Sequence, residues 1–233
     1  MKTIGLVGGM SWESTLEYYR IINEEVKARL GGFHSGRVVL YSVDFAGIEA
    51  MQHRGEWDAM ADILADAFRS VERAGADVGI LCTNTMHKVY DRLQAAVRIP
   101  ILHIVDVTAQ EIKARWIARV GLLGTKFTME QDFYRDRLVK THGIDVLIPG
   151  PEDRDAIHAI LYNELCLGEV KDASRAVFNA IIGRLQERGA QGVVLGCTEI
   201  PLIVRQADHD IPVFDTTTLH AKAAVEYALR GHE

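Results

Sequence analysis

The sequence repeats itself at a nearly constant spacing, and this internal repeat constrains the possible folds more than any other feature. The segment AGADVGILCTNT (Ala74–Thr85) aligns without gaps to RGAQGVVLGCTE (Arg188–Glu199). Two further pairs follow in the same order, namely TIGLVGGM with RVGLLGTK (Thr3–Met10 and Arg119–Lys126) and IPIL with IPVF (Ile99–Leu102 and Ile211–Phe214). Self-similarity of this kind indicates two copies of one structural unit.

Short apolar runs rich in β-branched residues alternate with longer amphipathic segments, which is typical of an α/β protein with mostly parallel sheets. The predicted strands are Thr3–Val7, Arg37–Val43, Val78–Leu81, Ile101–Ile104, Arg119–Leu123, Asp145–Ile148, Gly192–Leu195 and Val213–Phe214. The predicted helices are Glu13–Leu30, Trp57–Arg73, Glu130–Thr141, Arg154–Leu167 and Lys171–Arg188. We therefore predict two similar α/β domains related by a pseudo-two-fold axis, residues 1–100 plus 211–233 and residues 101–210, with the active site in the cleft between them.

Composition excludes several functional classes. Of the 233 residues, 48% are hydrophobic and 25% are charged, which supports a folded core and argues against disorder. Scattered Lys and Arg and a formal net charge of −6 argue against a nucleic-acid partner. No apolar run is long enough to span a membrane, and the start of the chain does not resemble a signal peptide. Three cysteines without CxxC spacing argue against disulfides or a zinc site and favour a reducing cytoplasm.

Polar and glycine residues collect where the repeated strands end. Gly8 and Gly9 in one copy and Gly124 in the other precede hydroxyl residues at a predicted helix start. Such loops expose backbone N–H groups to an anion, although Ser11 and Ser14 are equally explained as helix caps. The spacing is not that of a dinucleotide fingerprint, so a nucleotide site is not expected.

The other two strand ends carry the motifs LCTNTMH (Leu81–His87) and GCTEI (Gly196–Ile200). A cysteine between a strand and a helix lies at the positive end of the helix dipole, so we predict a thiol pKa of Cys197 lowered from about 8.5 toward neutrality. The ungapped repeat places Thr83 opposite Cys197, whereas Cys82 matches only if one residue is skipped. Glu199 either tunes this thiol or caps the next helix.

Two proton-transfer groups on facing halves suit removal of a proton from one face of a carbon and its return on the other. The carbanion formed in between needs hydrogen-bond donors, which Asn84, Thr85, Thr125 and Thr198 are placed to supply. No Schiff-base lysine context is evident, so we expect a reaction without pyridoxal phosphate or any other cofactor.

The chain resembles the aspartate/glutamate racemase family, on the motifs GLVGGMSWEST, LCTNTMH and GCTEI. The resemblance covers essentially the whole chain and implies a cofactor-independent homodimer that inverts the α-carbon of an amino acid. Family members carry paired catalytic cysteines; here Cys197 matches one, and Thr83 stands where the other is expected. The sequence looks close to enterobacterial members with the same LCTNTMH variant.

The resemblance also implies substrate contacts. Asn84, Thr85 and Thr198 hold the amino and carboxylate groups, Thr125 adds backbone donors, and Met10 lies in the first loop. Two basic groups hold the side-chain carboxylate in members strict for aspartate; those regions here contain Gln52, with His53 and Arg54, and Cys166, with Lys171 nearby. We therefore expect a neutral pocket with modest aspartate and glutamate activity, or a broader range that includes homoserine.

Two other functions agree with the same residues. One is a cysteine-dependent isomerase or decarboxylase of a small dicarboxylic acid; the other is an amino-acid-binding protein without catalysis. His87, His103 and His220 lack the helical spacing of metal ligands and are predicted to be structural, and no metal is expected. Trp12 and Trp57 are predicted to be packing residues rather than ligand contacts.

Overall fold

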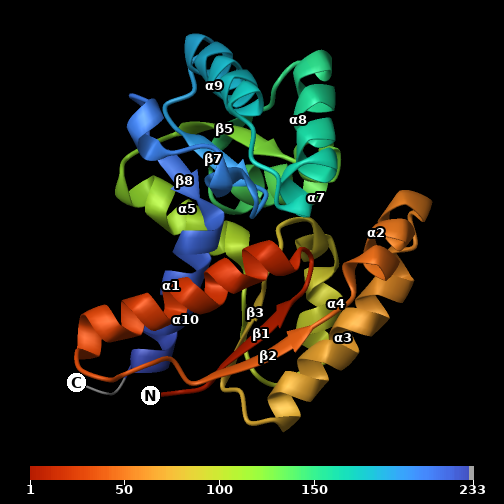
Figure 1. Ribbon diagram of the computed structural model, residues 1–233, viewed down its shortest axis with the longest axis vertical. Coiled ribbons are helices and arrows are strands. Elements are labelled where there is room, and N and C mark those ends of the chain that lie inside the picture. Colours follow the sequence, from red (N-terminus) through yellow and green to blue (C-terminus); the bar gives the residue numbers. More distant parts are fainter. Residues whose placement is uncertain (231–233) are drawn as a thin grey trace. The chain divides into compact units, whose positions relative to one another are not determined.

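The computed structural model describes residues 1–230, which form two compact units, each built on a four-stranded parallel sheet (Figure 1). One unit contains Met1–His103 and resumes at His220, and the other contains Ile104–Leu219. The strand orders are β2-β1-β3-β4 and β6-β5-β7-β8, so each strand of one sheet has a counterpart at the same place in the other. The predicted α/β class is confirmed, and the sequence repeat corresponds to a repeat of topology.

The first unit alternates strands and helices along the chain. Its elements are β1 (Ile4–Gly8), α1 (Trp12–Leu30), β2 (Val38–Ser42), α2 (Phe45–Arg54), α3 (Trp57–Arg73), β3 (Val78–Leu81), a 3₁₀ turn (Thr85–Val89), α4 (Tyr90–Ala95) and β4 (Ile101–Leu102). Strands β1 and β3 are buried at every residue, as expected for strands that are covered by helices on both faces.

The second unit follows the same alternation with more short helices. Its elements are α5 (Ile104–Ala114), β5 (Arg119–Gly124), α6 (Lys126–Glu130), α7 (Asp132–Asp136), a π-helical turn (Arg137–Thr141), β6 (Asp145–Leu147), α8 (Pro151–Asn163), a 3₁₀ turn (Leu165–Leu167), α9 (Asp172–Glu187), β7 (Val193–Gly196), two more 3₁₀ turns (Ile200–Leu202 and Gln206–Asp208) and β8 (Val213–Asp215). The last helix, α10 (Thr216–Leu229), begins in this unit and continues into the first.

Alternate residues of each strand point into two separate apolar layers. In the first unit, Ile4 and Leu6 pack with α1 and α10, whereas Val7 packs with α2 and α3. In the second, Leu122 packs with α5 and α7, whereas Leu123 packs with α8 and α9. Each unit is therefore a three-layer α/β/α sandwich. Within the described residues, no helix combines the length and the apolar character that a membrane span requires.

The unit boundaries differ from those predicted from the sequence. Strand β4 pairs with β3, so residues 101–103 remain with the first unit. Strand β8 pairs with β7, so residues 211–219 belong to the second unit instead of the first. Sequence periodicity identified both strands but contained no signal for which sheet would receive an edge strand of two or three residues.

Two predicted helices are also interrupted. The segment predicted as one helix over Glu130–Thr141 consists of the end of α6, α7 and the π-helical turn. The segment predicted over Arg154–Leu167 ends as an α-helix at Asn163, and Cys166 lies in a separate 3₁₀ turn. The apolar spacing predicted continuous helices, but it arises from apolar residues that are buried in several short helical segments in succession.

Candidate active site

The loop after β1 is held by hydrogen bonds to the first turn of α1. Ser11 is the N-cap of this helix, and its side chain accepts a hydrogen bond from the Ser14 amide. The Thr15 hydroxyl donates to the Ser11 carbonyl (2.8 Å) and accepts from the Gly9 amide (2.9 Å). The capping interpretation of Ser11 is therefore confirmed, and the loop is fixed close to the end of β2.

Glycine is required at position 9 of this loop. Its φ is +90°, and a Cβ atom there would lie 2.3 Å from the Val43 carbonyl oxygen and 2.7 Å from the Ser42 hydroxyl oxygen. The backbone of the loop thus lies against the end of β2, closer than any side chain permits.

The second loop of the first unit follows β3 and carries Thr83, Asn84 and Thr85, all of them buried. The Thr83 amide donates to the Leu81 carbonyl (2.8 Å), and its carbonyl bonds to Nδ1 of His87 (2.8 Å). Because both bonds hold the backbone of residue 83, the loop has one defined conformation at the carboxyl end of β3.

Cys82 does not share this environment. Its side chain is fully buried in the apolar layer formed by β1, β3, α1 and α10, and burial raises the pKa of its thiol well above the usual range. A thiol in such a place is protonated and inert. Thr83 is therefore the proton-transfer candidate of this loop.

Three buried histidines lie behind the Thr83 loop. The rings of His87 and His103 have centroids 4.7 Å apart, and that of His220 lies 5.9 Å from His87. His220 bonds to the Tyr18 hydroxyl (3.1 Å) and the Leu102 carbonyl (2.9 Å), while burial lowers its pKa to about 4. His220 is therefore neutral near pH 7, which suits the structural role predicted for it. Apart from the four-residue separation of the two residues, nothing in the sequence indicates the bond between His87 and the Thr83 carbonyl.

Two further predicted contacts of the first unit, Met10 and Gln52, are also buried. Met10 packs in the apolar layer beside α2 and α3, and Gln52 on α2 donates to the sulfur of Met86 (3.3 Å). By contrast, His53 and Arg54 are exposed and pair with Glu49 and Glu56. Of these three neighbouring residues, only Gln52 is buried in the unit.

In the second unit, Cys197 follows directly after β7 and is bound to its own sequence neighbour. Its Sγ donates to Oε2 of Glu199 (2.9 Å), and the Thr198 hydroxyl donates to the same oxygen (3.1 Å). All three side chains are buried. The sequence left open whether Glu199 tunes the thiol or caps a helix. In the structure, its carboxylate accepts a hydrogen bond from the Cys197 thiol.

The prediction of a lowered thiol pKa at Cys197 is wrong in sign. Burial raises the pKa of Cys197 well above its usual value, and the negative charge of Glu199 and an electrostatic interaction with Cys166 raise it further. The element that follows, Ile200–Leu202, is a single 3₁₀ turn and not an α-helix, so it has no substantial dipole to oppose these effects. In this state the thiol is protonated, and Glu199 is its hydrogen-bond acceptor.

The structure places Thr125 and Cys166 in the same unit as Cys197. Thr125 is the buried N-cap of α6, and its side chain accepts from the Thr128 amide (3.3 Å). Cys166 lies close enough to Cys197 to interact electrostatically with it. Lys171, the nearest cation in the sequence, is engaged by Glu169 (3.0 Å) and Glu164 (3.6 Å).

Comparisons with known proteins agree on one family. The model of the Asp/Glu/hydantoin racemase family matches residues 7–224. The broad specificity amino-acid racemase RacX of Bacillus subtilis is 23% identical over 227 residues, covering 95% of this chain and 96% of its own. A candidate Asp/Glu racemase of Yersinia pestis is 53% identical with a TM-score of 0.92, covering 99% of this chain and 100% of its own. An aspartate racemase homologue of Pyrococcus horikoshii is 36% identical with a TM-score of 0.85, covering 98% of this chain and 99% of its own.

Proposed function

Because the chain belongs to the Asp/Glu/hydantoin racemase family, and is thus an isomerase of the amino-acid racemase type, we propose that Cys197 and Thr83 exchange protons with one α-carbon from opposite faces. The observation that carries this proposal is the buried hydrogen bond between Cys197 and Glu199 at the end of β7. In the sequence repeat, Thr83 occupies the position equivalent to Cys197. No pyridoxal phosphate takes part in the proposed reaction.

Glu199 accepts the proton that makes Cys197 a base. The thiol transfers its proton to the Glu199 carboxylate, along the 2.9 Å contact, as the substrate ammonium group brings positive charge to the site. The resulting thiolate removes the α-proton and becomes a thiol again. Donors on Asn84, Thr85, Thr125 and Thr198 stabilise the negative charge that develops on the substrate carboxylate.

Thr83 completes the inversion by donating its hydroxyl proton to the other face of the carbanion. The resulting alkoxide regains a proton from Glu199, relayed by water, which restores both the hydroxyl and the Glu199 carboxylate. An alcohol is a sufficient acid toward a carbanion but a poor base near pH 7. Proton removal is therefore fast from the face next to Cys197 and slow from the face next to Thr83. Because the equilibrium constant of a racemisation is one, kcat/KM for inversion is the same for both enantiomers. The difference between the two faces is expected instead in the rates at which the α-proton of each enantiomer exchanges with solvent.

The pocket is proposed to be neutral toward the substrate side chain. The residues at the two positions expected to be basic are Gln52, which is buried and bonded to Met86, and Cys166. The neighbouring cations Arg54 and Lys171 are exposed and paired with carboxylates. Such a pocket discriminates weakly among side chains of similar size, so aspartate, glutamate and homoserine are all candidate substrates.

The proposed function is tested by incubating the enzyme alone with single enantiomers of aspartate, glutamate, asparagine and homoserine in D₂O. We expect inversion, seen by chiral chromatography, with uncharged side chains within about 100-fold of aspartate in kcat/KM. We also expect deuterium to enter the α-position of one enantiomer faster than inversion occurs. An achiral product would contradict racemisation, binding without exchange would contradict catalysis, and a strict preference for aspartate would contradict the neutral pocket.

The Glu199→Gln variant tests the role of the carboxylate. We expect kcat to fall by about 10- to 100-fold, because the amide does not take up the thiol proton. Since the negative charge of Glu199 raises the pKa of Cys197, its removal lowers that pKa. We therefore expect the pH at which the rate of Cys197 alkylation reaches half of its maximum to be lower in this variant. Glu169→Gln, which removes an exposed carboxylate paired with Lys171, is the matched control; an equal effect in both variants would contradict the role of Glu199.

A further inference from the structure

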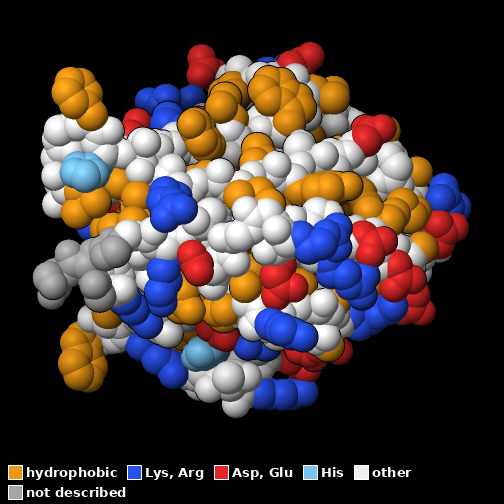
Figure 2. Space-filling view, turned by 90° about the horizontal axis from the view of Figure 1, so that it is seen from below, with side chains coloured by type: hydrophobic (Ala, Val, Ile, Leu, Met, Phe, Trp, Pro, Cys, Tyr) orange, Lys and Arg blue, Asp and Glu red, His pale blue; other side chains and the backbone are white. Residues whose placement is uncertain are grey.

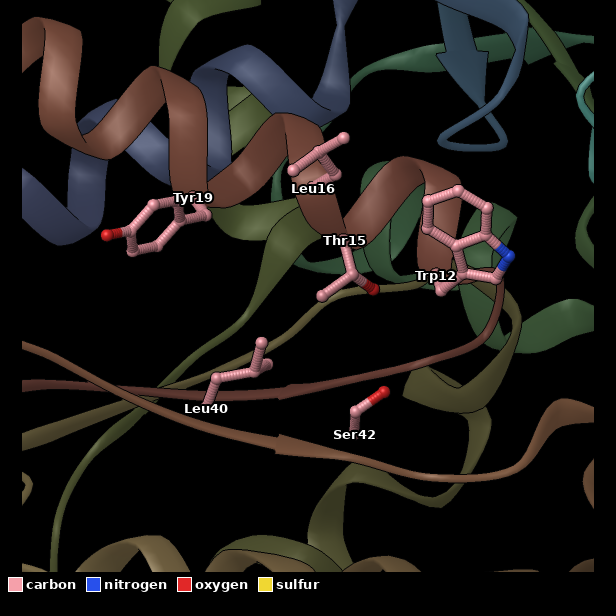
Figure 3. A pocket seen from close by; sticks show the side chains of 6 residues that line it. All are labelled: Trp12, Thr15, Leu16, Tyr19, Leu40 and Ser42. Carbon is pink, nitrogen blue, oxygen red and sulfur yellow. The ribbon is translucent and has the colours of Figure 1, made fainter.

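Helix α1 has two sides with different surroundings. On one side, Trp12, Leu16 and Tyr19 line an apolar hollow of about 340 Å³ between α1 and β2 (Figure 3). Trp12 was predicted to be a packing residue, but it is 65% exposed. On another side, Tyr18 is fully buried and its hydroxyl bonds to His220. Helix α1 therefore contacts the buried histidines through Tyr18, away from the hollow.

Carbonyl acceptors determine which ring nitrogens of two of these histidines carry a proton. His220, which is neutral near pH 7, donates from Nε2 to the Leu102 carbonyl (2.9 Å), because a carbonyl oxygen only accepts. Its Nδ1 then accepts from the Tyr18 hydroxyl (3.1 Å). By the same rule, Nδ1 of His87 carries a proton and donates to the Thr83 carbonyl (2.8 Å). His87 thus links the buried histidines to the backbone of Thr83.

Two backbone hydrogen bonds define the path of the loop on either side of this contact. The Thr83 amide donates to the Leu81 carbonyl (2.8 Å), which bends the chain tightly after β3. The His87 amide donates to the Asn84 carbonyl (3.1 Å) at the start of the 3₁₀ turn. Since Thr83 is held through both its amide and its carbonyl, its backbone rotation is restricted, and the direction of its Cα–Cβ bond is fixed with it.

Aromatic rings hold the imidazole of His87 in place. The Tyr90 ring lies nearly parallel to it, with an interplanar angle of 9° and centroids 6.3 Å apart, and the His103 ring lies 4.7 Å away. Tyr90 is itself fixed, because its hydroxyl donates to the Ile101 carbonyl of β4 (2.9 Å). The imidazole is therefore held by contacts outside the loop to which it bonds.

Hydrogen bonding and volume, rather than charge, determine what a substitution of His87 changes. Within residues 1–230, the one buried side chain of Lys, Arg, Asp or Glu is that of Glu199, in the second unit. The others are half-buried or exposed, and Figure 2 shows both signs of charge side by side on the surface. An uncharged residue in place of His87 therefore leaves no buried carboxylate or cation of its own unit without a partner.

We propose that His87 is a positioning residue for racemisation, because its hydrogen bond to the Thr83 carbonyl aims the Thr83 hydroxyl at the α-carbon. This inference rests on the proposed function, in which Thr83 protonates one face of the carbanion and Cys197 serves the other. Proton transfer depends steeply on distance and angle, so a looser loop slows the Thr83 step. The Cys197 step does not involve this loop and is retained. A histidine that was predicted to be structural thus acts on one of the two proton transfers.

Three substitutions of His87 separate the hydrogen bond from the ring. His87→Asn keeps a donor in the same place, because the amide nitrogen of Asn is bonded to Cγ, as Nδ1 is. Asn23 on α1 makes this kind of bond to the Tyr19 carbonyl four residues earlier (2.7 Å). His87→Leu has nearly the shape of Asn without a donor, and His87→Phe keeps a ring without a donor. Thr108→Val is the control, since it removes a buried side-chain bond to the carbonyl four residues earlier in α5 (2.8 Å).

The measurement compares two rates in D₂O: inversion, by chiral chromatography, and α-deuteration without inversion, by NMR. The substrate is whichever of aspartate, glutamate, asparagine and homoserine the natural protein inverts fastest. For His87→Leu and His87→Phe we expect inversion to fall about 10- to 100-fold, while deuteration of the enantiomer that Cys197 serves stays within about 2-fold of the natural rate. We expect His87→Asn to recover most of the inversion, and Thr108→Val to leave the ratio of the two rates unchanged.

The backbone amide signal of Asn84 in heteronuclear NMR reports the hydrogen bond without any substrate, because this amide belongs to the same peptide group as the Thr83 carbonyl. The Leu and Asn variants both lose the imidazole ring, so the difference between their Asn84 signals reports the donor alone. We expect the Asn variant to lie closer to the natural protein. Identical Asn84 signals in the two variants, equal loss of inversion in both, or a parallel loss of inversion and deuteration would overturn the role of His87. A natural protein that neither inverts nor deuterates an amino acid would instead contradict the proposed function.

Discussion

Replacing Cys197 by alanine is expected to lower deuterium incorporation at the α-carbon by about 10³-fold or more, because it removes the thiol that exchanges protons fast. The measurement is the rate of α-deuteration of each enantiomer of aspartate in D₂O, followed by NMR. The loss falls on the enantiomer whose α-proton faces Cys197, while inversion of both enantiomers is lost together. Unchanged exchange of both enantiomers would remove Cys197 from the mechanism.

Variants of the loop that carries Thr83 complete this experiment. Thr83→Ala is expected to abolish inversion but to retain exchange into the enantiomer that Cys197 serves. Thr83→Cys is expected to accelerate exchange of the other enantiomer by about 10-fold or more, since a thiol is a far better base than an alcohol. Cys82→Ala is expected to change kcat little, because that thiol lies in the apolar layer. A large loss with Cys82→Ala and none with Thr83→Ala would reverse the assignment.

Replacing Gly9 by alanine is expected to destabilise the protein by about 3 kcal/mol or more, through strain and overpacking combined. The φ of +90° disfavours a side chain, and the added methyl group would lie 2.3 Å from the Val43 carbonyl oxygen. The measurement is the urea midpoint of unfolding, with racemisation assayed under native conditions. We expect activity to fall as well, because the loop no longer lies against the end of β2.

Gly55→Ala is the matched control for this substitution. Gly55 also has a positive φ, +72°, but a Cβ atom there would have no heavy atom within 4 Å. We therefore expect a cost of about 1 kcal/mol, from conformation alone. If both variants lost the same stability, the close approach at Gly9 would not be the cause.

The fold was largely predictable because burial on both faces of a parallel sheet leaves continuous apolar runs in the sequence. All eight strands were located within a residue or two of their positions, and the repeat indicated two similar halves. The longer helices missed are Phe45–Arg54, Ile104–Ala114 and Thr216–Leu229, although the first has an Asp44 cap and a glycine end at Gly55. The unit boundary was misplaced because pairing of short edge strands depends on distant contacts.

The candidate site was predictable only in part. The repeat paired Thr83 with Cys197, but the state of the thiol depends on burial and on a carboxylate, neither of which strand-end position reveals. The exposure of Trp12 was missed for a related reason. An apolar residue at the start of a helix looks the same in a sequence whether its side chain is buried or, as for Trp12, exposed.

The equivalence of the two sheets has a further consequence. In the proposed mechanism, each half carries its own acid–base group on its own loop, so that the chemistry of one stereochemical face would be encoded apart from that of the other. A substitution in the LCTNTMH loop is then expected to alter proton exchange on the face that Thr83 serves and to leave the hydrogen bond between Cys197 and Glu199 intact. Under this proposal, duplication separates two half-reactions that a single symmetrical catalyst would have to adjust together.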